Sequence, residues 1–217
     1  MTLAYETATH VCSVAFQNAH GERFEQRSTE RGKHSEHVFL FTRSLMEEHG
    51  FSISDVTRVL VSNGPGSYTG LRIAASAVKG LLFGLDIPLY AGNTLASIGV
   101  GARPHHTEHT VHAILDARRT HVYHQAFDTR EGLSSLSEPA ITEITEFERQ
   151  VSEGDVIAGT GLNRLNSHLL PAHTAIGEES ISAVHLFDLP SVFLTKTSPE
   201  AFDATYITTG QVNNSPS

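Results

Sequence analysis

Short apolar runs alternate with longer helical patterns along the first half of the chain. Between Ser35 and Gly50 the apolar residues recur every three to four positions, which is typical of a helix. A second helical pattern runs from Tyr68 to Leu85, after a turn rich in glycine and proline. The predicted strands are Leu3–Glu6, Val11–Phe16, Arg23–Arg27, the run that begins at Arg58, and Ile87–Ala91, followed by a helical segment near Thr94–Gly99.

Both predicted helices carry more apolar surface than one neighbour can cover. In the helix from Tyr68, two adjacent stripes are apolar or small, and the polar face is limited to Arg72, Ser76 and Lys79. A helix that is apolar over more than half its girth is covered on two sides. The pattern therefore predicts either a helix buried in the core or a helix whose second side meets another subunit.

The pattern of strands and helices starts again at Val111. It predicts strands at Val111–Leu115 and His121–Phe127, a capped helix at Thr142–Val151 and a buried strand at Val156–Ala158, whereas the signals weaken after Leu170. This repetition predicts an α/β protein of two ribonuclease H-like lobes, the duplication of the actin-like ATPase superfamily, with mixed sheets flanked by helices. We place the first lobe at residues 1–102 and a degenerate second lobe with a polar tail at 103–217.

Composition excludes several classes of protein. The 217 residues suffice for one large domain or two small lobes, and no apolar run approaches the roughly eighteen residues of a membrane span. The first residues alternate like a strand and do not resemble a signal peptide. A single cysteine, Cys12, cannot form an internal disulfide, so we expect a cytoplasmic protein. A formal net charge of −9 argues against nucleic-acid binding by the chain alone.

The turn before the second helix has two interpretations. Gly64, Gly66 and Ser67 surround Pro65 at a helix start, where free backbone N–H groups attract phosphate. The spacing is not that of a P-loop, and no lysine follows the last glycine. The alternative is a structural bend with Ser67 as the helix cap.

Charged residues at strand ends suggest a nucleotide site. Glu6 and Asp116, with Arg118 near the latter, lie where carboxylates hold Mg-nucleotide in kinases of this superfamily. The alternative is that Asp116 caps a turn and pairs with the neighbouring arginines. We predict no metal site, because His34 and His37 lack an evident third ligand and are expected to face solvent. The residues that could be proposed as the third ligand are His105, His106 and His109. Cys12 is expected to be a buried packing residue, and no catalytic residue is assigned.

Four segments carry a specific resemblance to a known family. Residues 64–73 read GPGSYTGLRI, and residues 3–9, 34–36 and 115–119 read LAYETAT, HSE and LDARR. In order and spacing these segments resemble the motifs of the TsaB (YeaZ) family over about residues 3–127. Glu6 stands where that family usually has Asp, and the longer paralogue TsaD carries Glu there. TsaD also has two metal-binding histidines, spaced HxxxH, where Asn93–Gly101 contains none.

The resemblance implies a non-catalytic scaffold subunit for formation of N6-threonylcarbamoyladenosine at position 37 of ANN-reading tRNAs. Such a subunit binds and activates the transferase TsaD, enables docking of the ATPase TsaE, contacts tRNA only through the complex, and forms a homodimer in isolation. It holds no cofactor of its own, and any ATP or ADP at the complex interface is bound mainly by partners. The implied interface, of about 1,600 Å² in total, uses Val38, Phe41, Thr42, Leu45, Gly70, Ala74, Ala77 and Leu81.

Three other functions stay open. A stand-alone ATPase or kinase of the actin-like fold is one, and ATP·Mg titration would test it. A metallopeptidase-like enzyme is the second, although the absent histidine pair in Asn93–Gly101 argues against it. A structural homodimer without a catalytic partner is the third.

Overall fold

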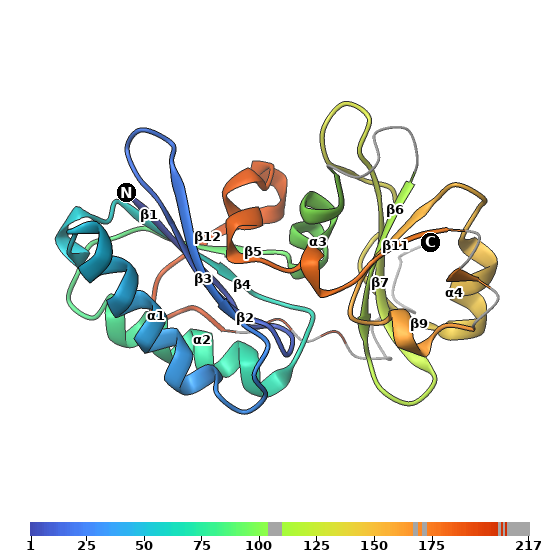
Figure 1. Ribbon diagram of the computed structural model, residues 1–217, viewed down its shortest axis with the longest axis horizontal. Helices are drawn as coiled ribbons and strands as arrows, with labels where there is room; N and C mark the ends of the chain where they lie inside the picture. Colours follow the sequence, from blue (N-terminus) through green and yellow to red (C-terminus); the bar gives the residue numbers. More distant parts are fainter. Residues whose placement is uncertain (104–109, 167–168, 171–172, 204, 206, 208–217) are drawn as a thin grey trace.

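Two mixed β-sheets with a helix between them organise the chain (Figure 1). The computed structural model describes residues 1–103, 110–166, 169–170, 173–203, 205 and 207. Among these residues the strands form two six-stranded sheets, and each sheet combines antiparallel and parallel pairs. The predicted α/β architecture is therefore confirmed.

The central strands of the first sheet are buried on both faces. Its strand order is β12-β5-β4-β1-β2-β3, in which β1 pairs antiparallel with β2 and parallel with β4. Along β1, Leu3 and Tyr5 pack into the cluster beneath the outer helices, whereas Ala4 faces the other sheet. Because both faces are covered, residues 3–5 of β1 form an unbroken apolar run before Glu6. Five strands of this sheet come from the first part of the chain: β1 (Thr2–Glu6), β2 (Cys12–Gln17), β3 (Arg23–Ser28), β4 (Arg58–Ser62) and β5 (Leu89–Gly92). The sixth strand, β12, comes from near the end of the chain.

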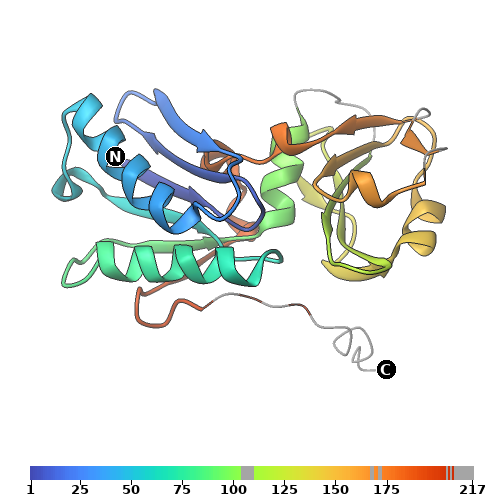
Figure 2. The same ribbon diagram turned by 60° about the horizontal axis from the view of Figure 1, so that its bottom comes forward.

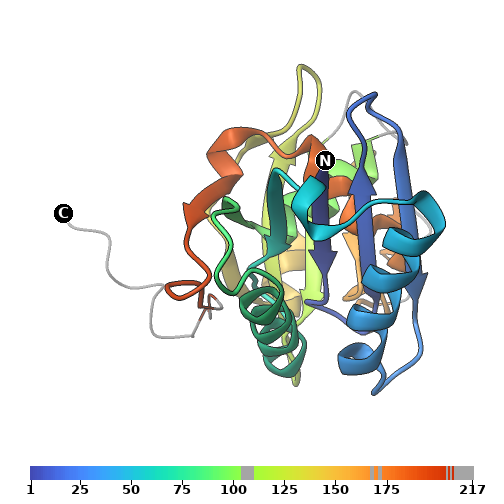
Figure 3. The same cartoon turned by 90° about the vertical axis from the view of Figure 1, so that its left-hand side faces the viewer.

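Helices α1 (His34–His49) and α2 (Tyr68–Leu81) lie side by side on one face of this sheet (Figures 2 and 3). Gly50, at φ 65°, ends α1 in the left-handed turn that the sequence predicts. The predicted N-cap Ser35 is wrong, because α1 begins one residue earlier, with Lys33 in the cap position and no side-chain cap bond. The predicted end of α2 at Leu85 is also wrong, since the chain leaves the helix after Leu81.

The second sheet repeats the hairpin-and-parallel-strand arrangement of the first. Its order is β11-β10-β6-β7-β8, and β9 also pairs with β7. The predicted helix at Thr142–Val151 begins two residues late in the structure, because Thr142 lies on strand β9. The elements are β6 (Thr110–Asp116), β7 (His121–Asp128), β8 (Ser134–Ser135), β9 (Ala140–Glu143), α4 (Ile144–Gln150), β10 (Val156–Gly159) and β11 (Thr174–Ile176).

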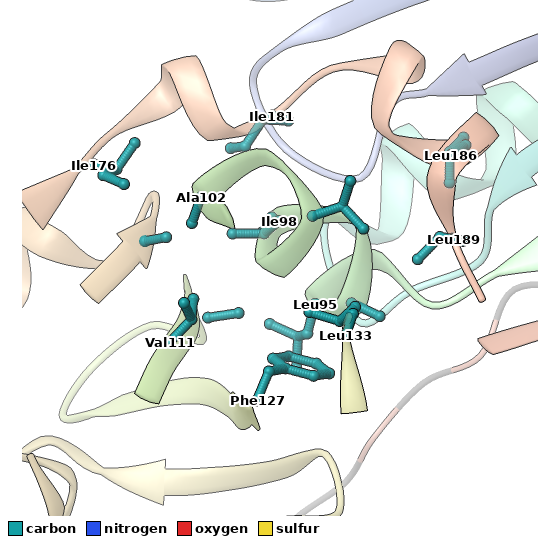
Figure 4. Close-up of a cluster of buried hydrophobic side chains, with 14 of the residues drawn as sticks. Leu95, Ile98, Ala102, Val111, Phe127, Leu133, Ile176, Ile181, Leu186 and Leu189 are labelled. Carbon is teal, nitrogen blue, oxygen red and sulfur yellow. The ribbon is translucent and has the colours of Figure 1, made fainter. Parts of the chain in front are cut away.

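Helix α3 (Thr94–Ala102) fills the space between the two sheets. Every residue of α3 is buried, and its Leu95, Ile98 and Ala102 pack in one apolar cluster with Val111 and Phe127 of the second sheet (Figure 4). The same cluster contains residues of the first sheet and of the segment that crosses between the lobes. The two lobes therefore share a continuous apolar core, which is the condition under which domains do not move independently.

The chain returns to the first sheet near its end. After the short helical turns η5 (Glu178–Ser180), η6 (Ala183–Asp188) and η7 (Ser191–Phe193), strand β12 (Leu194–Thr197) pairs antiparallel with β5. This return was not predicted from the sequence. The division at residue 102 stays a prediction, and β12 belongs by pairing to the first sheet. No helix in the part of the chain that the structure describes has the length and apolarity needed to cross a bilayer.

Candidate functional site

A groove of about 380 Å³ is lined by residues of α1 and α2. Two aromatic side chains border it: Phe39 of α1 is 60% exposed and Tyr68 of α2 is 56% exposed. Large aromatic side chains that reach solvent beside an apolar hollow mark an interaction site more often than isolated surface residues do. The lining residues are Ser35, Phe39, Tyr68, Thr69, Arg72, Ile73, Ser76 and Ala77.

Most of the residues predicted to contact a partner lie beneath this groove. Six of the eight, Val38, Thr42, Leu45, Gly70, Ala74 and Ala77, are buried, whereas Phe41 and Leu81 are partly buried. The Thr42 hydroxyl donates to the Val38 carbonyl at 2.7 Å and lies 3.1 Å from the Tyr5 hydroxyl. Most of these side chains therefore pack in the chain's own core, and their contact with a partner stays a prediction.

Arg72 and Tyr68 form a pair at the edge of the groove. The Arg72 guanidinium lies 5.3 Å from the centre of the Tyr68 ring, and its Nη1 donates to the Tyr68 hydroxyl at 2.5 Å. Stacking on the ring orients the guanidinium and keeps its charge at the surface. Arginine and tyrosine are enriched among the residues that dominate binding at protein interfaces.

The turn between β4 and α2 packs directly on the loop that follows β1. A Cβ on Gly66 would lie 2.3 Å from the Ala8 carbonyl oxygen, and a Cβ on Gly70 would lie 2.0 Å from the Thr7 carbonyl oxygen. The Ser67 N–H donates to the Ala8 carbonyl at 2.6 Å, and the Ser67 hydroxyl accepts the cap bond from the Gly70 N–H at 3.3 Å. The two glycines are thus required for this close approach, and the predicted cap is confirmed.

Several N–H groups of the turn are used within the chain. The Asn63 N–H donates to the Gly92 carbonyl at 2.8 Å, and the Gly64 N–H donates to the Thr94 hydroxyl at 3.0 Å. Pro65 has no N–H to offer. Since Ser67 also donates internally, the structure favours the structural interpretation of this turn, and phosphate binding at Gly64, Gly66 and Ser67 stays a prediction.

Glu6 is enclosed at the end of β1. Its Oε1 accepts a hydrogen bond from the Ala8 N–H at 2.7 Å, and its side chain is buried. Burial raises the pKa of this carboxyl from 4.5 to about 7, and the bond from Ala8 opposes the rise in part. At neutral pH the group is therefore divided between its neutral and charged forms, and its role toward a nucleotide stays a prediction.

Asp116 caps a turn in the second sheet, as the structural alternative predicted. Its Oδ1 accepts from the Arg118 N–H at 2.7 Å, and both Arg118 and Arg119 have positive φ angles, of 71° and 51°. The ion pair, however, is with Arg164 at 2.8 Å rather than with the adjacent arginines. Arg164 also donates to the Arg119 carbonyl, so one distant side chain closes the whole turn.

His34 holds the loop after β1 against the start of α1. Its Nε2 lies 3.0 Å from the Thr9 carbonyl oxygen, and burial lowers its pKa, so the neutral ring donates this bond. The expectation that His34 faces solvent is therefore wrong. His37 stacks on Phe41, with ring centres 4.8 Å apart. Within the described ranges no three metal-ligating side chains come together; His105, His106 and His109 lie outside them.

Comparison with known proteins assigns the chain to a family. The model of the family TsaD, tRNA N6-adenosine threonylcarbamoyltransferase, matches residues 28–177. The tRNA threonylcarbamoyladenosine biosynthesis protein TsaB of Escherichia coli (strain K12) is 30% identical over 171 residues, which cover 73% of this chain and 71% of that protein. The chain belongs to the TsaB (YeaZ) family.

Further members agree with this assignment. The TsaB protein of Bacillus subtilis (strain 168) is 30% identical over 131 residues, which cover 60% of this chain and 56% of that protein. YeaZ from Pseudomonas aeruginosa superposes with a TM-score of 0.74 at 26% identity, over 87% of this chain and 89% of that chain. Together with the two mixed sheets, this neighbour confirms the predicted actin-like fold.

Three of the four TsaB-like motifs meet at one place in the structure. The loop Thr7–Thr9 receives the close approach of Gly66 and Gly70 from the start of α2, and it receives the hydrogen bond of His34 from the start of α1. These motifs therefore fix the loop after β1 against the first turns of the two helices that form the groove. The fourth motif, at residues 115–119, closes the turn in the second sheet.

A buried polar network in the second lobe was missed by the sequence analysis. His112 Nε2 lies 3.2 Å from Asp155 Oδ2, and His112 Nδ1 lies 3.0 Å from His124 Nε2. Since the carboxylate takes the Nε2 proton of His112, His124 donates to His112 Nδ1. Burial lowers the pKa of His124 to about 3, and the nearby His112 adds to this effect. The only signal in the sequence is that both histidines interrupt apolar strands.

Proposed function

We propose that this chain is a non-catalytic subunit in the formation of N6-threonylcarbamoyladenosine at position 37 of tRNAs that read ANN codons. In this role it binds and activates the transferase TsaD and enables the ATPase TsaE to dock. Membership of the TsaB family supports the pathway, because named members are tRNA threonylcarbamoyladenosine biosynthesis proteins. The structural observation that carries the proposal is the aromatic-bordered groove between α1 and α2.

The groove supplies what a docking surface needs. Exposed Phe39 and Tyr68 offer large apolar area on rigid helices, and Arg72 adds a charged group held on an aromatic ring. The start of each helix is fixed by the loop after β1, so the surface is ordered before a partner arrives. TsaD occupies this surface in the complex, and a second copy of the chain occupies it in isolation.

The residues at the strand ends support a scaffold rather than a catalyst. Glu6 is buried and bonded to the backbone, and Asp116 is occupied by Arg118 and Arg164. Helix α3, which stands where TsaD is expected to carry its metal-binding histidines, contains no histidine and is wholly buried. The reacting groups, and any ATP or ADP, are accordingly held mainly by the partners.

The charge of the chain supports an indirect contact with tRNA. A net charge of −9 repels the phosphate backbone, so affinity for tRNA comes from the assembled complex in the cytoplasm.

Reconstitution tests this proposal. Modified tRNA is measured with TsaD, TsaE and a source of threonylcarbamoyl-adenylate, with and without this chain. We expect modification to depend on the chain, and Phe39→Asp to weaken TsaD binding about 30-fold, the effect of losing about 2 kcal/mol at a binding hot spot. Leu136→Asp is the matched control, because Leu136 is 56% exposed in the second lobe. Full modification without the chain, or ATP turnover by the chain alone, would contradict the proposal.

A further inference from the structure

After β12 the chain crosses from the edge of the first sheet to α2 (Figure 2). We name the described residues 198–203 and Thr205 the C-terminal strap. Its first turn is closed by the Phe202 N–H, which donates to the Ser198 carbonyl at 2.9 Å. The Phe202 side chain is 2% exposed and belongs to the apolar cluster that also contains Ala74 and Val78 of α2. An aromatic side chain near the end of the chain therefore fills a place in the core of the first lobe.

The strap has a second anchor on the turn that precedes α2. The Thr205 N–H donates to the Asn63 carbonyl at 2.9 Å, and Asn63 Nδ2 donates to the Thr205 hydroxyl at 2.9 Å. The strap also approaches Gly64 so closely that a Cβ there would lie 2.4 Å from the Thr205 carbonyl oxygen. Gly64, with φ 106°, has the conformation and the missing side chain that admit this contact.

These two anchors have the chemistry of peptide recognition. The main-chain N–H of Thr205 is paired with a fixed acceptor, and the aromatic side chain of Phe202, three residues earlier, fills an apolar pocket. In bound extended peptides, main-chain hydrogen bonds likewise give affinity, and pockets for side chains give specificity. Between the strap and α2 a hollow of about 390 Å³ remains. It is lined by Tyr68, Arg72, Ala75, Ser76, Lys79, Phe202 and Asp203.

We propose that the Phe202 pocket and the Asn63–Gly64 turn form a docking site for an extended peptide with an aromatic anchor, and that the C-terminal strap is its resident ligand. While the strap is bound, it holds the turn from which α2 starts. When the strap leaves, the pocket and the Asn63 carbonyl become available to a segment with the same spacing of aromatic residue and N–H donor. The hollow beside the strap adjoins the α1–α2 groove along α2, because Tyr68, Arg72 and Ser76 line both.

The full-length chain with Phe202→Ala tests the proposal, because the variant empties the pocket and leaves the turn intact. The probe is a fluorescent peptide with the sequence of residues 198–205, and binding is followed by fluorescence anisotropy. We expect the variant to bind the peptide at least about tenfold more tightly than the wild-type chain does, since the wild-type pocket is already filled. The same peptide with alanine for phenylalanine should lose this binding, and so should the double variant with Asn63→Pro, which distorts the turn.

Val192→Ala is the matched control, since Val192 is an exposed apolar residue close in sequence to the strap. It should behave as the wild-type chain. If Phe202→Ala does not fold by circular dichroism, Phe202→Val replaces it, because the smaller apolar side chain leaves the pocket partly empty and should still bind the peptide more tightly than the wild-type chain does. Peptide binding that is equal in the variant and the wild-type chain, or absent from both, would overturn the proposal.

Discussion

Replacing Glu6 by Gln should stabilise the chain at pH 8 and change its stability little at pH 4. Burial raises the pKa of Glu6 from 4.5 in the unfolded chain to about 7 in the folded one, so between these values the folded state binds more protons. The free energy of unfolding therefore falls as pH rises through this window. At about 1.4 kcal/mol for each pH unit, the interval from 4.5 to about 7 is worth about 3 kcal/mol.

Urea unfolding of the wild-type chain and the variant at pH 4, 5, 6, 7 and 8 measures this effect. Gln is neutral throughout, and its Oε1 can still accept from the Ala8 N–H, as Glu6 does at 2.7 Å. All other titrating groups are common to both proteins and cancel in the difference. We expect the difference in unfolding free energy to grow by about 1.4 kcal/mol for each pH unit between pH 5 and 7, and to level off at higher pH.

Asp55→Asn provides a control of opposite sign. The pKa of Asp55 is lowered by the N–H and hydroxyl groups of Ser52, so its carboxylate stabilises the folded state at neutral pH and loses this effect as pH falls. This variant should be less stable than the wild-type chain at pH 7 and equal to it at low pH. A Glu6→Gln difference that does not change with pH would refute the conclusion that the buried carboxyl resists ionisation.

Three further predictions concern the backbone contacts and the buried network. Gly70→Ala should destabilise the chain by about 3 kcal/mol, because the added Cβ meets the Thr7 carbonyl oxygen. Gly80→Ala, on the exposed side of α2, should stabilise the chain by up to about 1 kcal/mol. Thermal unfolding of the two variants measures both effects. Burial lowers the pKa of His124 from 6.5 to about 3, so the unfolding free energy should fall as pH drops below 6.5, by up to about 1.4 kcal/mol for each pH unit. In urea titrations at several pH values, a His124→Gln variant should show a smaller change of unfolding free energy with pH. Arg164→Ala should lower the unfolding free energy by only about 1 kcal/mol, since the pair of Arg164 with Asp116 is partly exposed. The same variant should raise amide hydrogen exchange in the turn at residues 116–119. Unchanged exchange would contradict the role of Arg164 in closing that turn.

Periodicity located α1 and α2 but could not assign their apolar sides. Of the small-residue stripe, Gly70 lies against the loop after β1 and Ala74 packs in the core of the sheet, whereas Ala77 also lines the groove, and a contact of the stripe with a partner stays a prediction. An apolar arc shows that a helix face is covered, and it does not identify the neighbour that covers it. Phe39 and Tyr68, which border the groove, could be placed outside only once the two helices were set on the sheet.

Contacts between residues distant in sequence account for most of what the sequence analysis missed. Strand β12 has polar Thr195 and Lys196 at a sheet edge, so its four residues give no periodic signal. Arg164 replaces the adjacent arginines in the pair with Asp116, across 48 positions of sequence. The caps Gly50 and Ser67, in contrast, were predicted correctly because they act within a few residues. The approach of Gly66 and Gly70 to the loop after β1 spans more than fifty positions and was not predicted.

The core between the lobes bears on the proposed scaffold role. Helix α3 is buried along its whole length, and residues of both sheets join it in one apolar cluster. Opening the lobes would expose this cluster to water, which costs about 25 cal/mol for each Å² of apolar surface. We therefore expect the two lobes to move as one body, which would give the proposed docking groove between α1 and α2 a rigid support.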